Sequence, residues 1–108
     1  MTAVFEELAN LDRLIHEPAR LAILTALSAV ARADFIFLKR LTGLTVGNLS
    51  SHIAKLAEAG LITIEKQFIH NRPNTLIEIT PLGRNAIEKH WQQLDSLHRR
   101  VQTWSPDQ

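Results

Sequence analysis

Apolar residues recur along the chain at helical spacing first, and at the spacing of a strand later. From Val4 to Ile15 they fall three or four residues apart, as on one face of an amphipathic helix. Residues 18–30 start with a proline and are apolar nearly all round, which predicts a buried second helix. Its inward side chains are expected to be Leu21, Leu24, Ala26 and Leu27.

Two more helices are expected next, separated by a very short break. Asp34 is suited to cap a helix that ends at Gly43. Thr45 is suited to cap the following helix, which Gly60 ends. Two helices joined by a three- or four-residue turn containing glycine are typical of a helix-turn-helix, here predicted for residues 34–60.

After Gly60 the spacing changes to two. Residues 61–68 and 75–80 alternate apolar and polar positions, which predicts two antiparallel strands. The polar, proline-bearing residues 69–74 between them predict a hairpin loop longer than a tight turn. Thr80 and Pro81 then start a last helix, which we expect to reach about Trp104.

This order of elements predicts a mainly α fold with a small antiparallel β-hairpin, a winged helix-turn-helix. With 108 residues, 45% of them apolar and 21% charged, the chain is expected to form one globular domain over residues 1–108. Its expected parts are flanking dimerisation helices at 1–16 and 81–104, the helix-turn-helix at 34–60 and the wing at 61–80.

Cysteine usage and hydropathy narrow the class of protein. The chain has no cysteine, which excludes disulfides, thiolate metal sites and cysteine nucleophiles. It has no apolar run near the roughly 18 residues of a membrane helix and no basic start of a secretory signal. We therefore expect a cytoplasmic protein without membrane association.

The net charge of +1 is weak evidence for a polyanionic partner, but the charges are unevenly distributed. Between Lys39 and Arg72 there are five basic and two acidic side chains. The basic excess therefore falls on the helix-turn-helix and the wing.

The helix after Thr45 has an outer face rich in hydrogen-bonding groups. Asn48, Ser51, His52 and Lys55 share an arc opposite Leu49, Ile53, Leu56 and Val46, and no acidic residue occurs before Glu58. In a helix-turn-helix the outer side of the second helix faces the major groove of DNA. A solvated surface helix would be polar too, so this face alone does not decide the function. The residues predicted to contact DNA from this helix are Thr45, Gly47, Asn48, Ser50, Ser51, His52 and Lys55.

Each of these residue types suits a particular part of DNA. An asparagine can pair with adenine, and a serine or histidine can bond base edges or phosphates. Lys55 is better placed for a phosphate, and the small Gly47 and Ser50 let the helix start approach the DNA backbone, where a helix N-terminus favours phosphate. From the preceding helix, Lys39 and Arg40 are expected to reach the flanking backbone.

The expected wing carries a second set of candidates. An arginine held at a hairpin end is well shaped to enter a narrow minor groove, although an exposed polar loop would also contain such residues. The wing candidates are Lys66, His70, Asn71 and Arg72.

Three stretches carry a resemblance to a known family: "HEPARLAIL", "ADFIFLKRLTGLTVGNLSSHIAKLAEAGLI" and "RPNTLIEITPLGR". The sequence resembles the small winged-helix transcriptional regulators of the MarR-like and ArsR-like kind, most closely the compact group with no separate effector domain. The resemblance implies a sequence-specific, homodimeric binder of double-stranded DNA, commonly a repressor. It also implies that residues 45–59 form the recognition helix and 68–74 the wing. ArsR-type metal sensors often use cysteines near the recognition helix, and these are absent here.

The last helix has an apolar seam that calls for a covering partner. Ile87, Leu94 and Val101 are seven residues apart, with His90, Leu97 and Trp104 at complementary positions. The first helix could cover part of this seam, but we favour a two-fold dimer through the first and last helices, which suits a palindromic operator. The predicted dimerisation residues are Phe5, Leu8, Ile87, Trp91, Leu94, Leu97 and Val101.

No arrangement of residues predicts catalysis, a cofactor or a metal site. His90 and His98 are too far apart on their helix to share an ion, and the neighbouring Ser51 and His52 point in different directions. We therefore expect no enzyme. Two alternatives remain open: a winged-helix protein-interaction module without DNA binding, and a regulator whose small-molecule effector binds between the last helices, near Trp91 and Trp104.

Overall fold

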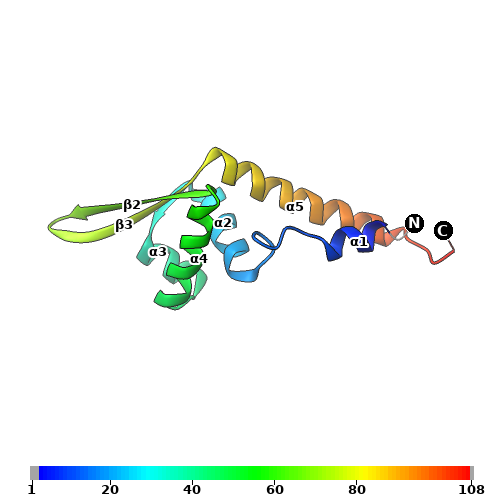
Figure 1. Cartoon of the computed structure of the whole chain (residues 1–108), viewed down its shortest axis with the longest axis horizontal. Helices are drawn as coiled ribbons and strands as arrows, with labels where there is room; N and C mark the ends of the chain where they lie inside the picture. Colours follow the sequence, from blue (N-terminus) through cyan, green and yellow to red (C-terminus); the bar gives the residue numbers. More distant parts are fainter. Residues whose placement is uncertain (1–2, 108) are drawn as a thin grey trace.

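Helices form most of the molecule, and one hairpin projects from it (Figure 1). The computed structural model describes residues 3–107. It measures 66 × 26 × 21 Å, with the hairpin at one end and the C-terminal end of the last helix at the other. The predicted winged helix-turn-helix is confirmed. The elements are α1 (Ala3–Ala9), α2 (Pro18–Val30), β1 (Arg32–Asp34), α3 (Phe35–Thr42), α4 (Val46–Glu58), β2 (Ile62–Ile69), β3 (Arg72–Ile79) and α5 (Pro81–Gln102).

The main core lies where α2, α3 and α4 meet the base of the sheet. Leu24 and Leu27 are fully buried, as predicted, but Leu21 and Ala26 are only partly buried. Ile23, absent from the expected set, is fully buried instead. Because α2 is apolar nearly all round, its sequence could not show which side faces inward.

The predicted caps of the helix-turn-helix are confirmed. The Asp34 carboxylate accepts from the Phe37 N–H at 2.7 Å, and the Thr45 hydroxyl accepts from the Asn48 N–H at 3.2 Å. Gly43 ends α3 with a φ of 70°, which glycine adopts at little cost. These local bonds fix the short turn that sets α4 against α3.

The first helix is shorter than predicted. It ends at Ala9, and residues 10–17 form turns instead of continuing to Ile15. Asn10 donates its side-chain amide to the Glu6 carbonyl, and the Asp12 carboxylate accepts from the Leu14 N–H. Such side-chain bonds to the backbone compete with helix, so the apolar spacing identified a buried residue, Ile15, but not its conformation.

The prediction of a long hairpin loop is wrong. β2 and β3 pair without a break as far as Ile69 and Arg72, and His70 and Asn71 alone make the turn, with φ of 51° and 62°. Two residues at positive φ form the tight turn whose twist suits a hairpin. Pro73 is tolerated in β3 because it lies beyond the segment that β1 pairs, where one edge of the strand is free.

A third strand, β1, was not predicted and makes the sheet three-stranded, in the order β1-β3-β2. β1 has only three residues, too few to show a period of two. It pairs with Leu76–Glu78 of β3 and so anchors the inner half of the hairpin to the helical body.

The start of α5 is fixed tightly to the short link between α4 and β2. The Thr80 hydroxyl donates to the Gly60 carbonyl at 2.7 Å and accepts from the Gly83 N–H at 2.9 Å, as predicted for a cap. A Cβ atom on Gly83 would lie well inside contact distance of the Leu61 carbonyl oxygen. Only glycine therefore lets α5 start so close to the backbone of Leu61.

The C-terminal half of α5 is partly covered by the N-terminal segment of the same chain. Val4 and Leu11 pack with Leu97 in a second apolar cluster, and the rings of Phe5 and Trp104 meet edge to face at 5.1 Å. Within residues 3–107, no helix is long and apolar enough to cross a membrane.

Candidate nucleic-acid interface

One side of α4 is open to solvent, next to the hairpin (Figure 1). Leu49, Ile53 and Leu56 hold the other side in the core, as predicted. Val46, expected to be inward, is 56% exposed. Of the predicted contacts, the exposed ones are Thr45, Gly47, Asn48, Ser50, Ser51 and Lys55.

His52 differs from its neighbours because its side chain is only 20% exposed and is bonded to α2. Its Nδ1 lies 3.0 Å from Nη1 of Arg20 and 3.5 Å from Oε2 of Glu17. His52 therefore lies at the edge of the open face, where α4 meets the start of α2.

Glu17 caps α2, a role the sequence did not reveal. Its two carboxylate oxygens accept from the N–H groups of Ala19 and Arg20, both at 3.0 Å. Burial by itself raises the pKa of Glu17, but these two N–H groups, helped by the charge of Arg20 and by that of His52 whenever its ring is protonated, outweigh burial and lower it. Glu17 is therefore a stable anion that occupies the N-terminus of α2.

The role of Arg20 was not predicted from the sequence either, although the sequence contained an indication of it. It is the one charged residue in the sequence of α2, in a helix that is otherwise apolar or weakly polar. Its Nε donates to the Leu14 carbonyl at 2.6 Å, and its Nη2 donates to the Arg13 carbonyl at 3.2 Å. A charged group in an apolar helix points to a specific partner, because burial without one is costly.

The predicted wing cations lie on opposite faces of the hairpin. Lys66 pairs with Thr75 across the strands and lies on the face that continues towards α4. Arg72 is three residues before Thr75, so it lies on the other face, next to the exposed turn of His70 and Asn71. The structure thus brings Lys66, but not Arg72, to the α4 side.

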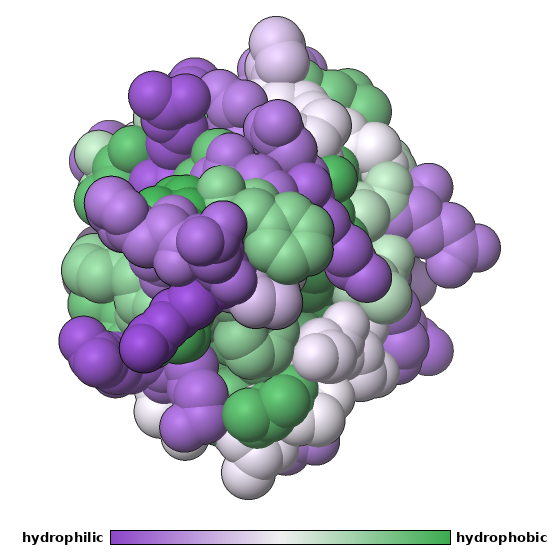
Figure 2. Space-filling model, turned by 90° about the vertical axis from the view of Figure 1, so that its left-hand side faces the viewer, coloured by the Kyte–Doolittle hydropathy of each residue, from purple (hydrophilic) through white to green (hydrophobic). Residues whose placement is uncertain are grey.

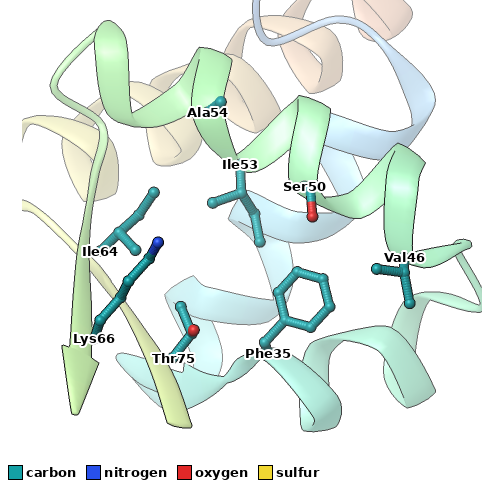
Figure 3. Close-up of a pocket in the computed structure, with 8 residues that line it drawn as sticks. All are labelled: Phe35, Val46, Ser50, Ile53, Ala54, Ile64, Lys66 and Thr75. Carbon is teal, nitrogen blue, oxygen red and sulfur yellow. The ribbon is translucent and has the colours of Figure 1, made fainter. Parts of the chain in front are cut away.

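A cleft of about 430 Å³ separates α4 from the hairpin (Figure 3). The Lys66 amine and the Ser50 hydroxyl point into it. A cation and hydroxyl groups in an otherwise apolar cleft suit an anionic group such as a phosphate. The lining residues are Phe35, Val46, Ser50, Ile53, Ala54, Ile64, Lys66 and Thr75.

The hairpin end also exposes apolar side chains. Phe68 is 77% exposed, more than any other large apolar residue of the described chain. Figure 2 looks at this end of the molecule and shows apolar surface interleaved with polar groups. Lys39 and Arg40, in the last turn of α3, are exposed just before the turn into α4. The large exposed apolar residues of α3, α4 and the hairpin are Ile36, Phe37, Leu41, Val46, Ile64, Phe68 and Ile69.

Two histidines form a pair between the N-terminal segment and α5. Nδ1 of His16 lies 3.0 Å from Nε2 of His90, which is 3% exposed. Burial lowers the pKa of His90, and a charge on His16 lowers it further, whereas Asp12 acts in the opposite direction. Within residues 3–107, no three acidic or histidine side chains come together to hold a metal ion.

The predicted dimerisation residues divide into two groups. Ile87 and Leu97 are buried inside the chain itself, because α2 and α1 cover that side of α5. Leu94 and Val101 are partly buried. Phe5, Leu8 and Trp91 remain exposed to 39–46%.

Trp91 borders an apolar groove of about 600 Å³ between α2 and α5. Its Nε1 donates to the Thr25 hydroxyl at 3.0 Å, which fixes the indole against α2. The other residues of the groove are Pro18, Leu21, Ala22, Ala26 and Ala29.

Known proteins share this arrangement. Residues 19–98 match the family described as "Winged helix DNA-binding domain". The chain is 31% identical over 90 residues to the uncharacterized protein MJ0432 of Methanocaldococcus jannaschii, covering 83% of this chain and 98% of that protein.

Solved structures of other proteins have a similar fold. A transcriptional regulator homologue from Pyrococcus horikoshii OT3 has a TM-score of 0.83 at 29% identity, covering 92% of this chain and 97% of that chain. A mutant MarR from E. coli shares the fold, with a TM-score of 0.72 at 20% identity over 97% of this chain and 76% of that chain. The chain therefore belongs to the winged helix DNA-binding domain family, and it is a DNA-binding transcriptional regulator rather than an enzyme.

Proposed function

We propose that this regulator binds specific sequences of double-stranded DNA as a homodimer and acts as a repressor. The observation that carries the proposal is the open side of α4, whose exposed positions include no acidic residue before Glu58. A surface of hydrogen-bonding groups and one cation, free of acids, suits the major groove.

The roles proposed for α4 follow from side-chain chemistry and position. Asn48, Ser51 and the open edge of His52 meet base edges, whereas Ser50 and Lys55 bond phosphates. A Cβ atom on Gly47 would meet no protein atom within 4 Å, so protein packing does not require glycine there. That supports a close approach of the DNA backbone at Thr45 and Gly47.

The hairpin and α3 supply flanking contacts in this proposal. Arg72, with His70 and Asn71 at the turn, enters the minor groove, where negative potential is strongest. Lys66 neutralises the phosphate that crosses the cleft between α4 and the hairpin. Lys39 and Arg40 contact the backbone beyond α4.

The homodimer is proposed to form through the outer sides of α1 and α5. Phe5, Leu8 and Trp91 are exposed there, and Leu94 and Val101 are only partly covered. Ile87 and Leu97 support this surface from within the chain instead of contacting the partner. A two-fold dimer would read a palindromic operator with half-sites about one DNA turn apart.

Selection of binding sites from random duplexes by the purified protein tests the proposal, with light scattering to measure its oligomeric state. We expect a palindromic site and a dimer. Recovery of a single, unrepeated half-site by a monomer would contradict the dimer. Recovery of no preferred sequence would contradict sequence-specific binding.

The exposed apolar residues of the hairpin favour a second candidate function, binding of a protein partner by the wing. Phe68 and Ile69 at the hairpin end are the kind of side chains that such an interface buries. A gel-shift titration with random duplex DNA at low salt separates the two functions. Measurable binding that weakens steeply with salt is expected of the DNA reader, whereas a protein-interaction module would not bind.

The groove at Trp91 favours one addition to the main proposal, an apolar small-molecule effector. The groove is lined almost entirely by carbon, and an aromatic residue borders it. Titration of candidate apolar compounds, followed by tryptophan fluorescence, should change the emission in the wild type. The change should be lost in Ala26→Leu, which fills the groove and leaves both tryptophans in place.

A further inference from the structure

The contacts of His52 define where its ring carries a proton. An arginine guanidinium has donors only, so the atom it meets must accept. Nη1 of Arg20 lies 3.0 Å from Nδ1 of His52, and Nδ1 can accept only when it carries no hydrogen. The remaining hydrogen of the neutral ring is then on Nε2.

Glu17 competes for the same nitrogen but is less favourably placed. Its Oε2 is 3.5 Å from Nδ1 of His52, beyond the usual length of a charge-assisted bond. Its carboxylate already accepts from two backbone N–H groups at 3.0 Å. A proton on Nδ1 would also face the Arg20 donor at 3.0 Å, so the bond from Arg20 determines the tautomer.

Arg20 is itself held in one orientation. Its side chain is 11% exposed, and its Nε and Nη2 donate to the carbonyls of Leu14 and Arg13. These two bonds leave Nη1 directed at α4. The guanidinium thus links the N-terminal segment, α2 and α4 through its three nitrogens.

The other edge of the His52 ring is open. Nε2 has no hydrogen-bond partner in the part of the chain that the structure describes. Over residues 3–107, no buried side-chain nitrogen or oxygen of a half-buried residue lacks a partner. An unpartnered Nε2 must therefore reach solvent, at the edge of the face of α4.

We propose that Arg20 is a positioning residue for DNA recognition: it holds His52 in the Nε2–H tautomer, so that α4 presents a hydrogen-bond donor to an acceptor on DNA. This role rests on the proposed function, since it needs α4 to contact DNA. The acceptors that fit are N7 or O6 of a purine and a phosphate oxygen. Neither an unoriented ring nor one with its proton on Nδ1 would make this contact.

The tautomer can be measured without DNA, by NMR of the ring nitrogens in full-length protein labelled with ¹⁵N-histidine. In the wild type, Nδ1 of His52 should resonate as an unprotonated nitrogen and Nε2 as a protonated one. Arg20→Gln should mix the two tautomers. Arg84→Gln is the matched control, because Arg84 is also a partly buried arginine that donates to a backbone carbonyl, that of Ser28. It should leave the His52 signals unchanged.

A double-mutant cycle on DNA affinity tests whether Arg20 acts through His52. Arg20→Gln and His52→Ala should each weaken binding about tenfold to a hundredfold, and the double variant should be no weaker than His52→Ala. His52→Gln should keep part of the affinity, because its amide N–H reaches the position of Nε2. His52→Asn, which reaches only the position of Nδ1, should not. Circular dichroism checks that each variant is folded.

The outcomes distinguish the proposal from the function on which it rests. Additive effects in the cycle, or a wild-type ring with its proton on Nδ1, would overturn the role of Arg20 while DNA binding stands. If the wild type binds no DNA, the proposed function and the role of Arg20 in recognition both fail, although the tautomer is still measured. Site selection identifies the acceptor: a changed base preference in His52→Asn indicates a purine, and weaker binding with an unchanged preference indicates a phosphate.

Discussion

At the scale of the residue, most of the local structure could be predicted where one side chain acts on its own backbone. Asp34, Thr45 and Thr80 were identified as caps because their short oxygen-bearing side chains are typical of that position. Glu17 caps α2 in the same way but was missed, since glutamate is uncommon there. Arg20 was missed because its partners come from two other segments, the N-terminal residues 13–17 and α4, which no local pattern reveals.

Two glycines of the chain should respond in opposite ways to the same substitution. Gly83→Ala forces a Cβ atom onto the Leu61 carbonyl oxygen and should destabilise the protein by about 1–3 kcal/mol, the usual range for overpacking. Gly47→Ala meets open space in a helix and should change stability by no more than about 1 kcal/mol, in the stabilising direction.

Urea denaturation measures both variants, and gel shifts measure their DNA affinity. Gly47→Ala should bind DNA more weakly than the wild type although it is no less stable. Equal stability of the two variants would contradict the close contact between α5 and Leu61.

At the scale of the element, periodicity located the helices and both long strands but failed where an element was short or locally interrupted. β1 is too short to show alternation, and the helix expected to reach Ile15 ends at Ala9. The turn at His70 and Asn71 was hidden because these polar residues and Pro73 resemble a loop. The face of α4 could be predicted, but not the burial of His52 at its edge.

Substitutions in α4 and the wing should separate base recognition from backbone contact. Asn48→Ala should alter sequence preference and cost about 1–3 kcal/mol of binding free energy. Lys55→Ala should weaken binding to all sequences and lower the slope of log affinity against log salt concentration by about 1. Arg72→Ala should weaken DNA binding because it removes the side chain proposed to enter the minor groove. Lys89→Ala, an exposed lysine on α5, is the control and should bind as the wild type does.

Gel-shift titrations at several salt concentrations measure these effects. If Asn48→Ala, Lys55→Ala and Arg72→Ala all retain wild-type affinity and preference, α4 and the wing are not the DNA-binding surface.

At the scale of the whole molecule, the N-terminal segment joins the two regions to which the function is assigned. His16 meets His90 on α5, and the adjacent Glu17 caps α2 beside His52 of α4. The apolar seam of α5 predicted a covering partner, and the structure provides part of that cover from the same chain. The area of this seam that is left for a second subunit depends on how distant segments pack together. The spacing of residues along the sequence does not reveal that packing.

The buried His90 should make stability depend on pH. Because burial lowers the pKa of His90, the unfolded chain takes up a proton at a higher pH than the folded chain does. The free energy of unfolding should therefore fall as the pH decreases from about 7 through the ordinary histidine pKa of about 6.5 and below it.

Urea denaturation over this pH range measures the dependence. His90→Gln should make the free energy of unfolding depend less steeply on pH. His98→Gln, which changes an exposed histidine of α5, should leave this dependence as in the wild type. A slope that is the same in all three proteins would contradict the lowered pKa of His90.

The two-residue turn of the hairpin has a consequence for how the wing can vary in length. A two-residue turn connects two opposite residues that exchange backbone hydrogen bonds, and such residue pairs alternate along the strands with pairs that exchange none. If one residue pair were removed from the hairpin, the turn would have to connect a pair without hydrogen bonds. The removal would also move Arg72 to the opposite face of the hairpin. The reach of the hairpin can therefore change only by two pairs at a time, in steps of four residues and about 7 Å.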